Sequence, residues 1–415
     1  MRRKMIDDAA ATPPELKQGE LVSKSYDFEL ITPMFGGDYE SFVLNKHTPI
    51  RSQSIKGQLR FWWRTMQDET NVKELLKKEN TIWGGDVEDE VENKTLQSRI
   101  KVSVTNFKNL KTAPITKERP YTDPNVLASY VLFPVLNDKK IENPSLLVQA
   151  SFTVTLTYKQ EKEKEAMNSL LLWALFGGVG ARTRRGCGSV YSEQLLKECG
   201  INSIADVKKF MDDTFGAGNS AELSYARIKG AKLFYLKSRA GDIKSLQQKY
   251  GEYRQARTPK RDGENHPGRS YWPEPDAIRL ITGSQSRLHE PKKDAEIWFP
   301  RAAFGLPIGT QFNHNGRGGG DPDDQMLEPI DDKGNIKKRW PSPYIIKQIK
   351  IGSETFNIML VLNQKFPAGL ALNKEPLDNE CLPANSKGKV MNTQDPLNGR
   401  TITQALADAL GMEEA

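Results

Sequence analysis

Residues 163–191 of this 415-residue chain read EKEAMNSLLLWALFGGVGARTRRGCGSVY. The first half is strongly apolar and predicts a buried helix over residues 163–176. Five glycines and three arginines follow within residues 177–189, which predicts a loop whose backbone can approach a ligand closely. We expect a short strand at residues 189–191. The stretch therefore predicts a buried helix, a basic glycine-rich loop and a returning strand.

The segments before this stretch complete a recognisable order of elements. Residues 54–66 (SIKGQLRFWWRTM) predict a helix, although Gly57 costs about 1 kcal/mol relative to alanine. Strand-like runs occur at residues 24–32 (KSYDFELIT), 99–105 (RIKVSVT), 128–136 (ASYVLFPVL) and 150–158 (ASFTVTLTY). The order is strand, helix, strands, helix, strand. This is the order of the ferredoxin-like βαββαβ unit, on which RNA-recognition-motif domains are built.

The second half of the chain gives a weaker pattern. A hairpin is expected between residues 344–351 (YIIKQIKI) and 356–362 (FNIMLVL), and short strands are expected at residues 232–237 and 278–281. Polar insertions rich in proline and glycine occupy residues 254–271 and 313–337. We predict three parts: a loosely ordered tail over residues 1–22, a first domain over 23–198 and a second domain over 199–415.

Composition excludes several classes of protein. The chain has 60 Lys and Arg against 53 Asp and Glu, a net charge of +7, so charge matters only where it is clustered. Three cysteines without C-x-x-C spacing exclude a disulfide framework and a cysteine-rich zinc site. The most apolar run, residues 170–180, is shorter than the ~20 residues that span a bilayer. The N-terminus lacks the apolar region of a secretory signal, so we expect a cytoplasmic protein.

Residues 49–64 (PIRSQSIKGQLRFWWR) hold four cations and no acid. On a helix, Lys56, Arg60 and Arg64 recur four apart and share one face, away from the apolar face. Like charges four apart destabilise an isolated helix by about 0.2–0.5 kcal/mol per pair, which favours presentation to an anion. The alternative is that acids elsewhere in the fold neutralise them. We interpret Trp62 and Trp63 as core residues rather than base-stacking platforms.

The loop at residues 177–189 has the composition of a phosphate-binding surface, with backbone amides and three guanidinium groups. It is neither a Walker A loop nor a G-x-G-x-x-G motif, so no nucleotide cofactor is indicated. A third stretch, residues 300–312 (PRAAFGLPIGTQF), places Arg301 in an apolar setting. Arg301 would either bind a ligand or support a loop between the domains.

Three segments together, LITPMFGGD, PIRSQSIKGQLRFWWR and ALFGGVGARTRRGCGSV, resemble the RAMP superfamily of CRISPR systems. Within it, the chain is similar to the first-numbered RAMP subunit of the type III-B (Cmr) effector complex. FGLP at residues 304–307 and SP at residues 342–343 resemble that subunit's second domain. The resemblance implies an α+β fold of two tandem ferredoxin-like domains with long insertions. It also implies a non-slicing subunit at the head end of an RNA-guided complex, which engages target RNA near the 3′ end of the guide.

The resemblance implies as partners CRISPR RNA, target single-stranded RNA and a neighbouring RAMP subunit, without membrane, metal or cofactor. It implies an RNA-binding set in which cations meet phosphates and glycines bring the backbone close. That set is Arg51, Ser54, Lys56, Arg60, Arg64, Gly177, Gly178, Gly180, Arg182, Thr183, Arg184, Arg185 and Arg301.

Two other classes of function stay open. Some RAMP proteins are metal-independent endoribonucleases, and His47, which precedes the basic helix, could act as a general base. His266, His289 and His314 show no nucleophile or metal pattern. Asp321, Asp323 and Asp324 are acidic enough to suggest a metal, but without the calcium-loop spacing they favour a solvated loop. The third class is a scaffold whose arginines bind acids of neighbouring subunits.

Overall fold

The computed structural model describes most of the chain. The described residues are 21–37, 42–45, 47–88, 93–116, 126–138, 140–216, 222–258, 268–286, 289–291, 297–312, 319–378 and 396–415. The expected tail over residues 1–22 lies outside them, except for Leu21 and Val22, which begin the first strand. His266 and His314 also lie outside them.

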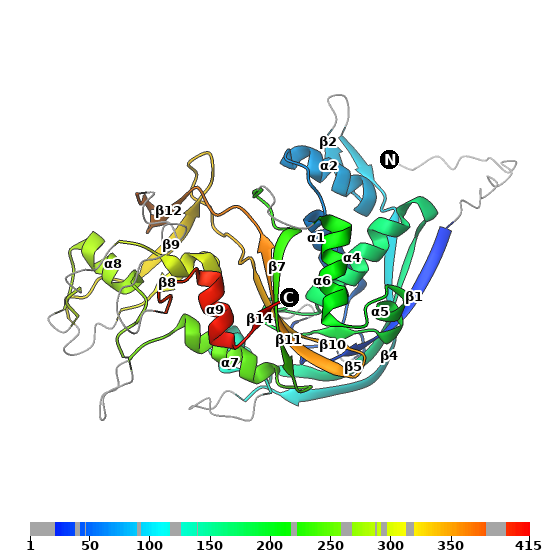
Figure 1. Ribbon diagram of the computed structural model, residues 1–415, viewed down its shortest axis with the longest axis horizontal. Coiled ribbons are helices and arrows are strands. Elements are labelled where there is room, and N and C mark those ends of the chain that lie inside the picture. Colours follow the sequence, from blue (N-terminus) through cyan, green and yellow to red (C-terminus); the bar gives the residue numbers. More distant parts are fainter. Residues whose placement is uncertain are drawn as a thin grey trace, which may run out of the picture.

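The first sheet has the predicted ferredoxin-like connectivity (Figure 1). Its strands lie in the order β4-β5-β1-β6, all antiparallel. Tyr26, Phe28 and Leu30 on β1 alternate with exposed residues and are buried, as the sequence pattern predicts. The elements of this unit are β1 (Leu21–Leu30), α1 (Ser52–Thr65), β4 (Ile100–Pro114), β5 (Ser145–Lys159), the 3-10 turn η1 (Gln160–Lys162), α4 (Glu163–Phe176) and β6 (Val190–Tyr191).

The second sheet repeats the same connectivity. The strand order β10-β11-β7-β14 is again second, third, first and fourth in the unit, and the expected hairpin at residues 344–362 is present. Its elements are β7 (Arg227–Ser238), α7 (Ile243–Arg254), β10 (Tyr344–Ile351), β11 (Glu354–Asn363), α9 (Ile402–Leu410) and β14 (Glu413–Glu414). The fold is therefore α+β with antiparallel sheets, and both units follow the βαββαβ order.

Insertions extend both units. In the first unit, α2 (Val72–Trp83), β2 (Gly85–Glu88) and β3 (Asn93–Leu96) lie between α1 and β4, in a region for which the sequence analysis predicted no element. In the second unit a third sheet, in the order β13-β12-β9-β8, lies at the far end of the molecule from β1 (Figure 1). The strands of this third sheet are β8 (Ile308–Thr310), β9 (Gln325–Ile330), β12 (Gly369–Leu372) and β13 (Glu375–Pro376). The second unit also contains α8 (Glu274–Thr282) and the 3-10 turn η2 (Pro300–Phe304).

Two predicted strands are helices. Residues 128–136 form α3 (Ser129–Leu136), and residues 278–281 belong to α8. In α3 the buried residues are Val131, Leu132, Val135 and Leu136, which is helical spacing. A short apolar run cannot be assigned by periodicity alone, and here packing against α7 favours the helix.

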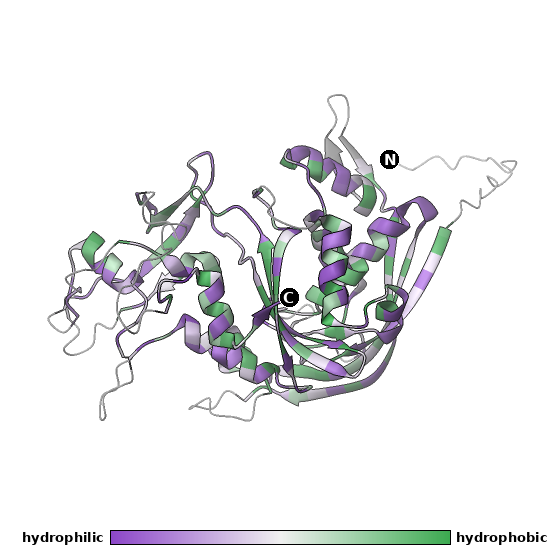
Figure 2. Ribbon diagram, viewed as in Figure 1, coloured by the Kyte–Doolittle hydropathy of each residue, from purple (hydrophilic) through white to green (hydrophobic). Residues whose placement is uncertain are grey.

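The helices of the first unit lie between the two sheets. α1 contacts both β4 and β7, and α4 contacts both β5 and β10. One apolar cluster therefore joins residues of both units, from Phe28 and Trp173 to Ile345 and Ile358. Figure 2 shows hydrophobic residues along α4 and α9, whereas α2 is largely hydrophilic. Strands β10 and β11 of the second sheet are consequently buried on both faces, and this apolar cluster is common to the two units.

The segment between the units holds α5 (Glu193–Glu198) and α6 (Ile204–Phe215). α5 contacts β1 of the first unit, and α6 contacts β7 of the second. We therefore propose that the boundary between the two domains lies between α5 and α6, at residues 198/199. Cys187 and Cys199 are free thiols. Within the part of the chain that the structure describes, no helix is long and apolar enough to cross a membrane.

Candidate functional site

Three cavities open around α1. α1 buries Ile55, Leu59, Trp62 and Trp63, which confirms the interpretation of both tryptophans as core residues. Its first turn carries no acid. The exposed side therefore presents polar and basic groups to the cavities, which we name the N-terminal, central and outer cavities.

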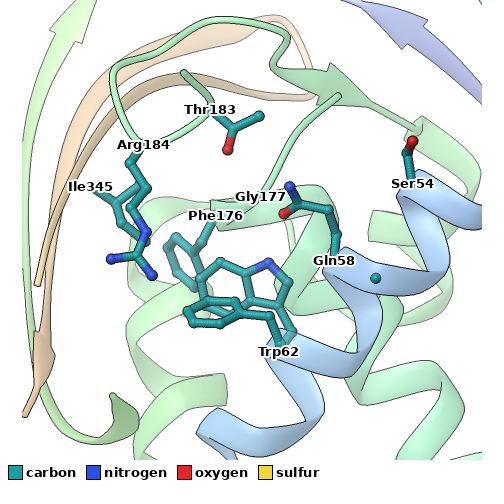
Figure 3. Close-up of a pocket in the computed structure, with 10 residues that line it drawn as sticks. Ser54, Gln58, Trp62, Phe176, Gly177, Thr183, Arg184 and Ile345 are labelled. Carbon is teal, nitrogen blue, oxygen red and sulfur yellow. The ribbon is translucent and has the colours of Figure 1, made fainter. Parts of the chain in front are cut away.

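The central cavity, of about 240 Å³, lies where the two units meet (Figure 3). Ser54 and Gln58 project into it from α1, opposite Thr183 and Arg184 of the glycine-rich loop, and Ile345 enters from β10 of the second unit. The Arg184 guanidinium carbon lies 5.0 Å from the centre of the Phe61 ring, a cation–π distance. A cation beside an aromatic face and an amide suits a nucleotide, with its phosphate and flat base.

The N-terminal cavity, of about 250 Å³, is adjacent to the central one, and Ser54 and Gln58 line both. Arg51 lies on one side, and the backbone of Gly178, Gly180 and Ala181 lies on the other. The outer cavity, of about 310 Å³, opens on the opposite flank of α1. Its lining residues are Gln53, Lys56, Gly57, Arg60, Trp83, Gly84, Leu96 and Ser98.

The glycines of the loop serve packing more than ligand approach. Gly177 and Gly178 are buried, and only Gly180 is exposed. A Cβ on Gly188 would lie 1.9 Å from the Val179 carbonyl oxygen, and one on Gly180 would lie 2.6 Å from that of Phe35. Gly180 and Gly188 also have positive φ, +78° and +67°. The loop is therefore folded back tightly on itself and on residues 33–36.

The three loop arginines have different environments. Arg184 donates to the Ser342 carbonyl, and burial, with help from the nearby Arg185 charge, lowers its pKa to about 10. Arg185 is buried and donates to the carbonyl oxygen of Tyr344 at 2.7 Å. Arg182 is exposed with a left-handed φ of +57°. Arg185 thus joins the two units, and Arg182 is the loop arginine most accessible to a ligand.

The basic row on α1 is partly neutralised, which corrects the expectation of an unpaired row. Glu79 of α2 is buried and accepts from Arg60 Nε at 2.6 Å and from Arg64 Nη1 at 2.7 Å. The acid comes from a helix that the sequence analysis did not predict. Lys56 has no such partner among the described residues, and burial together with the Arg60 charge lowers its pKa.

Glu79→Gln is expected to lower the free energy of unfolding by about 1–2 kcal/mol, because two charge-assisted hydrogen bonds lose their anionic acceptor. Both arginines are about one-third exposed, so water compensates part of the loss. Urea denaturation of the two proteins measures the difference. The neighbouring, exposed Glu74→Gln on the same helix serves as the charge-matched control and should leave stability within about 0.5 kcal/mol. Equal stability of Glu79→Gln and wild type would contradict the assigned role of Glu79.

Arg301 lies apart from the three cavities. It pairs with the buried carboxylate of Glu274 on α8, Nε to Oε2 at 3.0 Å, and is mostly buried itself. Of the two roles expected for Arg301, support of a loop fits this environment, and ligand binding does not. Asp321 is likewise not solvated: it is buried, accepts from Arg279 and lies 2.8 Å from His289 Nδ1. No group of metal-ligating side chains is present among the described residues.

Nine residues of the expected set line the three cavities. They are Arg51, Ser54, Lys56, Arg60, Gly177, Gly178, Gly180, Thr183 and Arg184. Arg64, Arg182, Arg185 and Arg301 do not line them. Gln58 and Phe61 were not predicted, although both share the helix face of Ser54 at the i+4 and i+7 positions. The sequence analysis also had no means to find Ile345, which comes from the other unit.

The outer face of the first sheet is polar where β1 and β5 pair. Ser23 and Thr157 are hydrogen-bonded at 2.8 Å, and Ser25 and Thr155 repeat the contact at the same distance. The aromatic residues Tyr26 and Phe28 point to the opposite, buried face. RNA-recognition motifs stack bases on aromatic residues of the open sheet face. These two strands offer hydroxyls instead, so α1 and the loop are the better candidates for RNA contact.

Comparison with known proteins agrees with this fold. The RAMP superfamily model matches residues 27–191. The chain is similar to CRISPR system Cmr subunit Cmr1-1 of Pyrococcus furiosus, with 31% identity over 182 residues, 40% of this chain and 50% of that protein. It is also similar to subunit Cmr1-2 of the same organism, with 28% identity over 195 residues, 42% of this chain and 96% of that protein.

The crystal structure of apo Cmr1 from Pyrococcus furiosus has a similar fold. Its TM-score is 0.50 at 17% identity, over 95% of this chain and 98% of that one. The sequence match spans only half the length of Cmr1-1. The match to the RAMP superfamily model covers α1 and the glycine-rich loop. The first unit of the chain therefore matches the RAMP superfamily model, and the chain as a whole shares the fold of apo Cmr1.

Proposed function

We propose that this chain is a non-catalytic RNA-binding subunit of a type III-B Cmr effector complex. In this proposal it lies at the head end, beside a neighbouring RAMP subunit, and engages target RNA near the 3′ end of the CRISPR RNA. The similarity to two Cmr1 subunits supports membership of such a complex. The observation that carries RNA binding is the set of three cavities around α1, in which Arg51 and Arg184 line the two cavities beside the glycine-rich loop and Lys56 lines the one on the opposite flank.

The chemistry of these cavities suits a grip that is blind to sequence. Cations contact phosphates, which position an RNA strand without reading it, and pairing with a guide supplies the sequence information. Phe61 adds a flat apolar surface next to Arg184, and every base can stack on such a surface. A protein that holds a guide–target pair needs this combination.

His47 is the residue on which the alternative, an endoribonuclease, would depend. Its side chain is exposed in the segment before α1 and does not line any of the three cavities. A general base must lie within hydrogen-bond reach of the 2′-hydroxyl that it deprotonates. RNA held in the cavities would therefore not meet this imidazole, and we propose binding without catalysis.

Fluorescence anisotropy with a single-stranded RNA of ~40 nucleotides tests this proposal at several salt concentrations. The variant combines Arg51→Gln, Lys56→Gln and Arg182→Gln, and Lys73→Gln on the exposed side of α2 controls for charge. The slope of log K against log salt is about −0.7 per phosphate contact, so the triple variant should lose about 2 units of slope. Its affinity at low salt should fall about thirtyfold, whereas the control should bind as tightly as wild type.

The alternatives predict other outcomes. Wild type that fails to bind RNA, yet co-purifies with the other Cmr subunits, would identify a scaffold and overturn RNA binding. RNA that is cleaved by wild type and left intact by His47→Ala would identify a nuclease and overturn the non-catalytic assignment. Failure to assemble with those subunits on size-exclusion chromatography would contradict membership of the complex.

A further inference from the structure

Gly57 occupies an unusual position in α1. It is exposed in the middle of a 14-residue helix, and a Cβ added there would meet no heavy atom within 4 Å. Packing within the chain therefore does not require glycine, although glycine destabilises a helix relative to alanine. Glycine suits a site where another backbone approaches closely. Gly57 is also the residue that the central and outer cavities share.

The outer cavity carries hydrogen-bond donors suited to an anion. Lys56 brings to it a cation without an acidic partner among the described residues, whereas Arg60 in the same lining is held by Glu79, and none of the eight lining residues is acidic. Trp83 lines it too; this side chain is fully buried, and its indole N–H has no acceptor among the described residues. The side chains of Lys, Arg and Trp can donate but not accept. A group with several acceptor oxygens, such as a phosphate, complements this lining.

The central cavity, on the other side of Gly57, differs in character. It combines the Arg184 cation with Phe61, Gln58 and Thr183, which suits a whole nucleotide rather than an isolated anion. We infer that a single RNA strand crosses α1 at Gly57, with one phosphate in the outer cavity and the adjoining nucleotide in the central cavity. This inference rests on the proposed function, because it gives the path of the RNA that the proposal assigns to α1.

The test is Gly57→Ala in the full chain, with binding of the ~40-nucleotide RNA followed by anisotropy. The added methyl group would stand where the strand crosses, so affinity should fall about tenfold. The melting temperature should stay the same or rise, because alanine favours the helix. Lys56→Gln is the second variant and should reduce the salt slope by about 0.7. Lys73→Gln is again the control for charge.

A double variant separates a strand crossing from two independent effects. If the strand crosses at Gly57, Gly57→Ala already displaces the phosphate from Lys56, so adding Lys56→Gln should change affinity less than twofold. Full affinity of Gly57→Ala, or additive losses in the double variant, would overturn the crossing. If wild type binds RNA and the triple variant loses binding while Gly57→Ala does not, only the crossing fails. If wild type does not bind RNA, the proposed function itself fails.

Discussion

Between pH 7 and pH 10 the wild-type protein is expected to gain about 1.4 kcal/mol of unfolding free energy per pH unit over a Lys347→Met variant. Lys347 is fully buried on β10, and burial lowers its pKa to about 7. Its ammonium donates to the carbonyl oxygens of Ala174 at 3.2 Å and Gly177 at 2.8 Å. These carbonyls close the C-terminal end of α4, where a cation is favoured, but burial opposes the charge.

The direction follows from proton counts in the two states. Below pH 7 both states bind the Lys347 proton, so the full cost of burying the charge is present. Between pH 7 and about 10.4 the unfolded chain keeps the proton while the folded protein releases it, so stability rises with pH. Above that range neither state is charged and the cost is absent. The total difference is about 5 kcal/mol.

Urea denaturation at pH 6.5, 8 and 9.5 measures the difference between wild type and Lys347→Met. Taking the difference removes the contribution of other groups that titrate in this range, such as Cys187, whose pKa burial raises to about 12. The exposed Lys73→Met on α2 is the matched control and should follow the wild-type curve. Parallel curves for wild type and Lys347→Met would show that Lys347 keeps its charge when folded.

Sequence patterns were sufficient to predict those elements that contact near neighbours in the chain or whose buried residues recur with a regular period. The alternation in residues 24–32 predicted which face of β1 is buried, and the apolar run predicted α4 over residues 163–176 as the structure has it. The order of these elements also predicted the first sheet. The strand predicted at residues 128–136 was wrong, because an apolar run of this length has no periodicity that distinguishes a strand from a helix.

Contacts between distant segments decide the site, and no local pattern contains them. The basic row on α1 was visible in the sequence, but its neutralising Glu79 belongs to another helix. Lys347 reaches an acceptor 170 residues away in the chain, and Ile345 enters the central cavity from the same strand. Residue type alone predicted that the arginines of α1 and of the glycine-rich loop would be functional. It could not divide them into those that hold the two units together and those that face a cavity.

Arg185→Ala is expected to lower the free energy of unfolding by about 3 kcal/mol and to leave RNA affinity of the folded protein within about twofold. Arg185 Nη1 donates to the Tyr344 carbonyl in the second unit, and the guanidinium carbon lies 4.8 Å from the centre of the buried Tyr250 ring. Alanine would leave that buried carbonyl without its donor and open a void over the ring, and both effects destabilise. Gln247, which donates to the Arg185 carbonyl at 2.8 Å, would lose a fixed partner as the loop loosens.

Arg182→Ala is the matched control, because it removes the same charge from the same loop at an exposed position. It should change stability by less than about 0.5 kcal/mol and reduce the salt slope of RNA binding by about 0.7. Urea denaturation followed by tryptophan fluorescence, together with anisotropy in buffer, measures both quantities for each variant. If Arg185→Ala loses RNA binding but keeps wild-type stability, Arg185 contacts RNA and does not join the two units. A loss of stability in Arg185→Ala together with a reduced salt slope in Arg182→Ala would assign Arg185 to the contact between the units and Arg182 to the ligand. The two arginines lie only three positions apart in one loop.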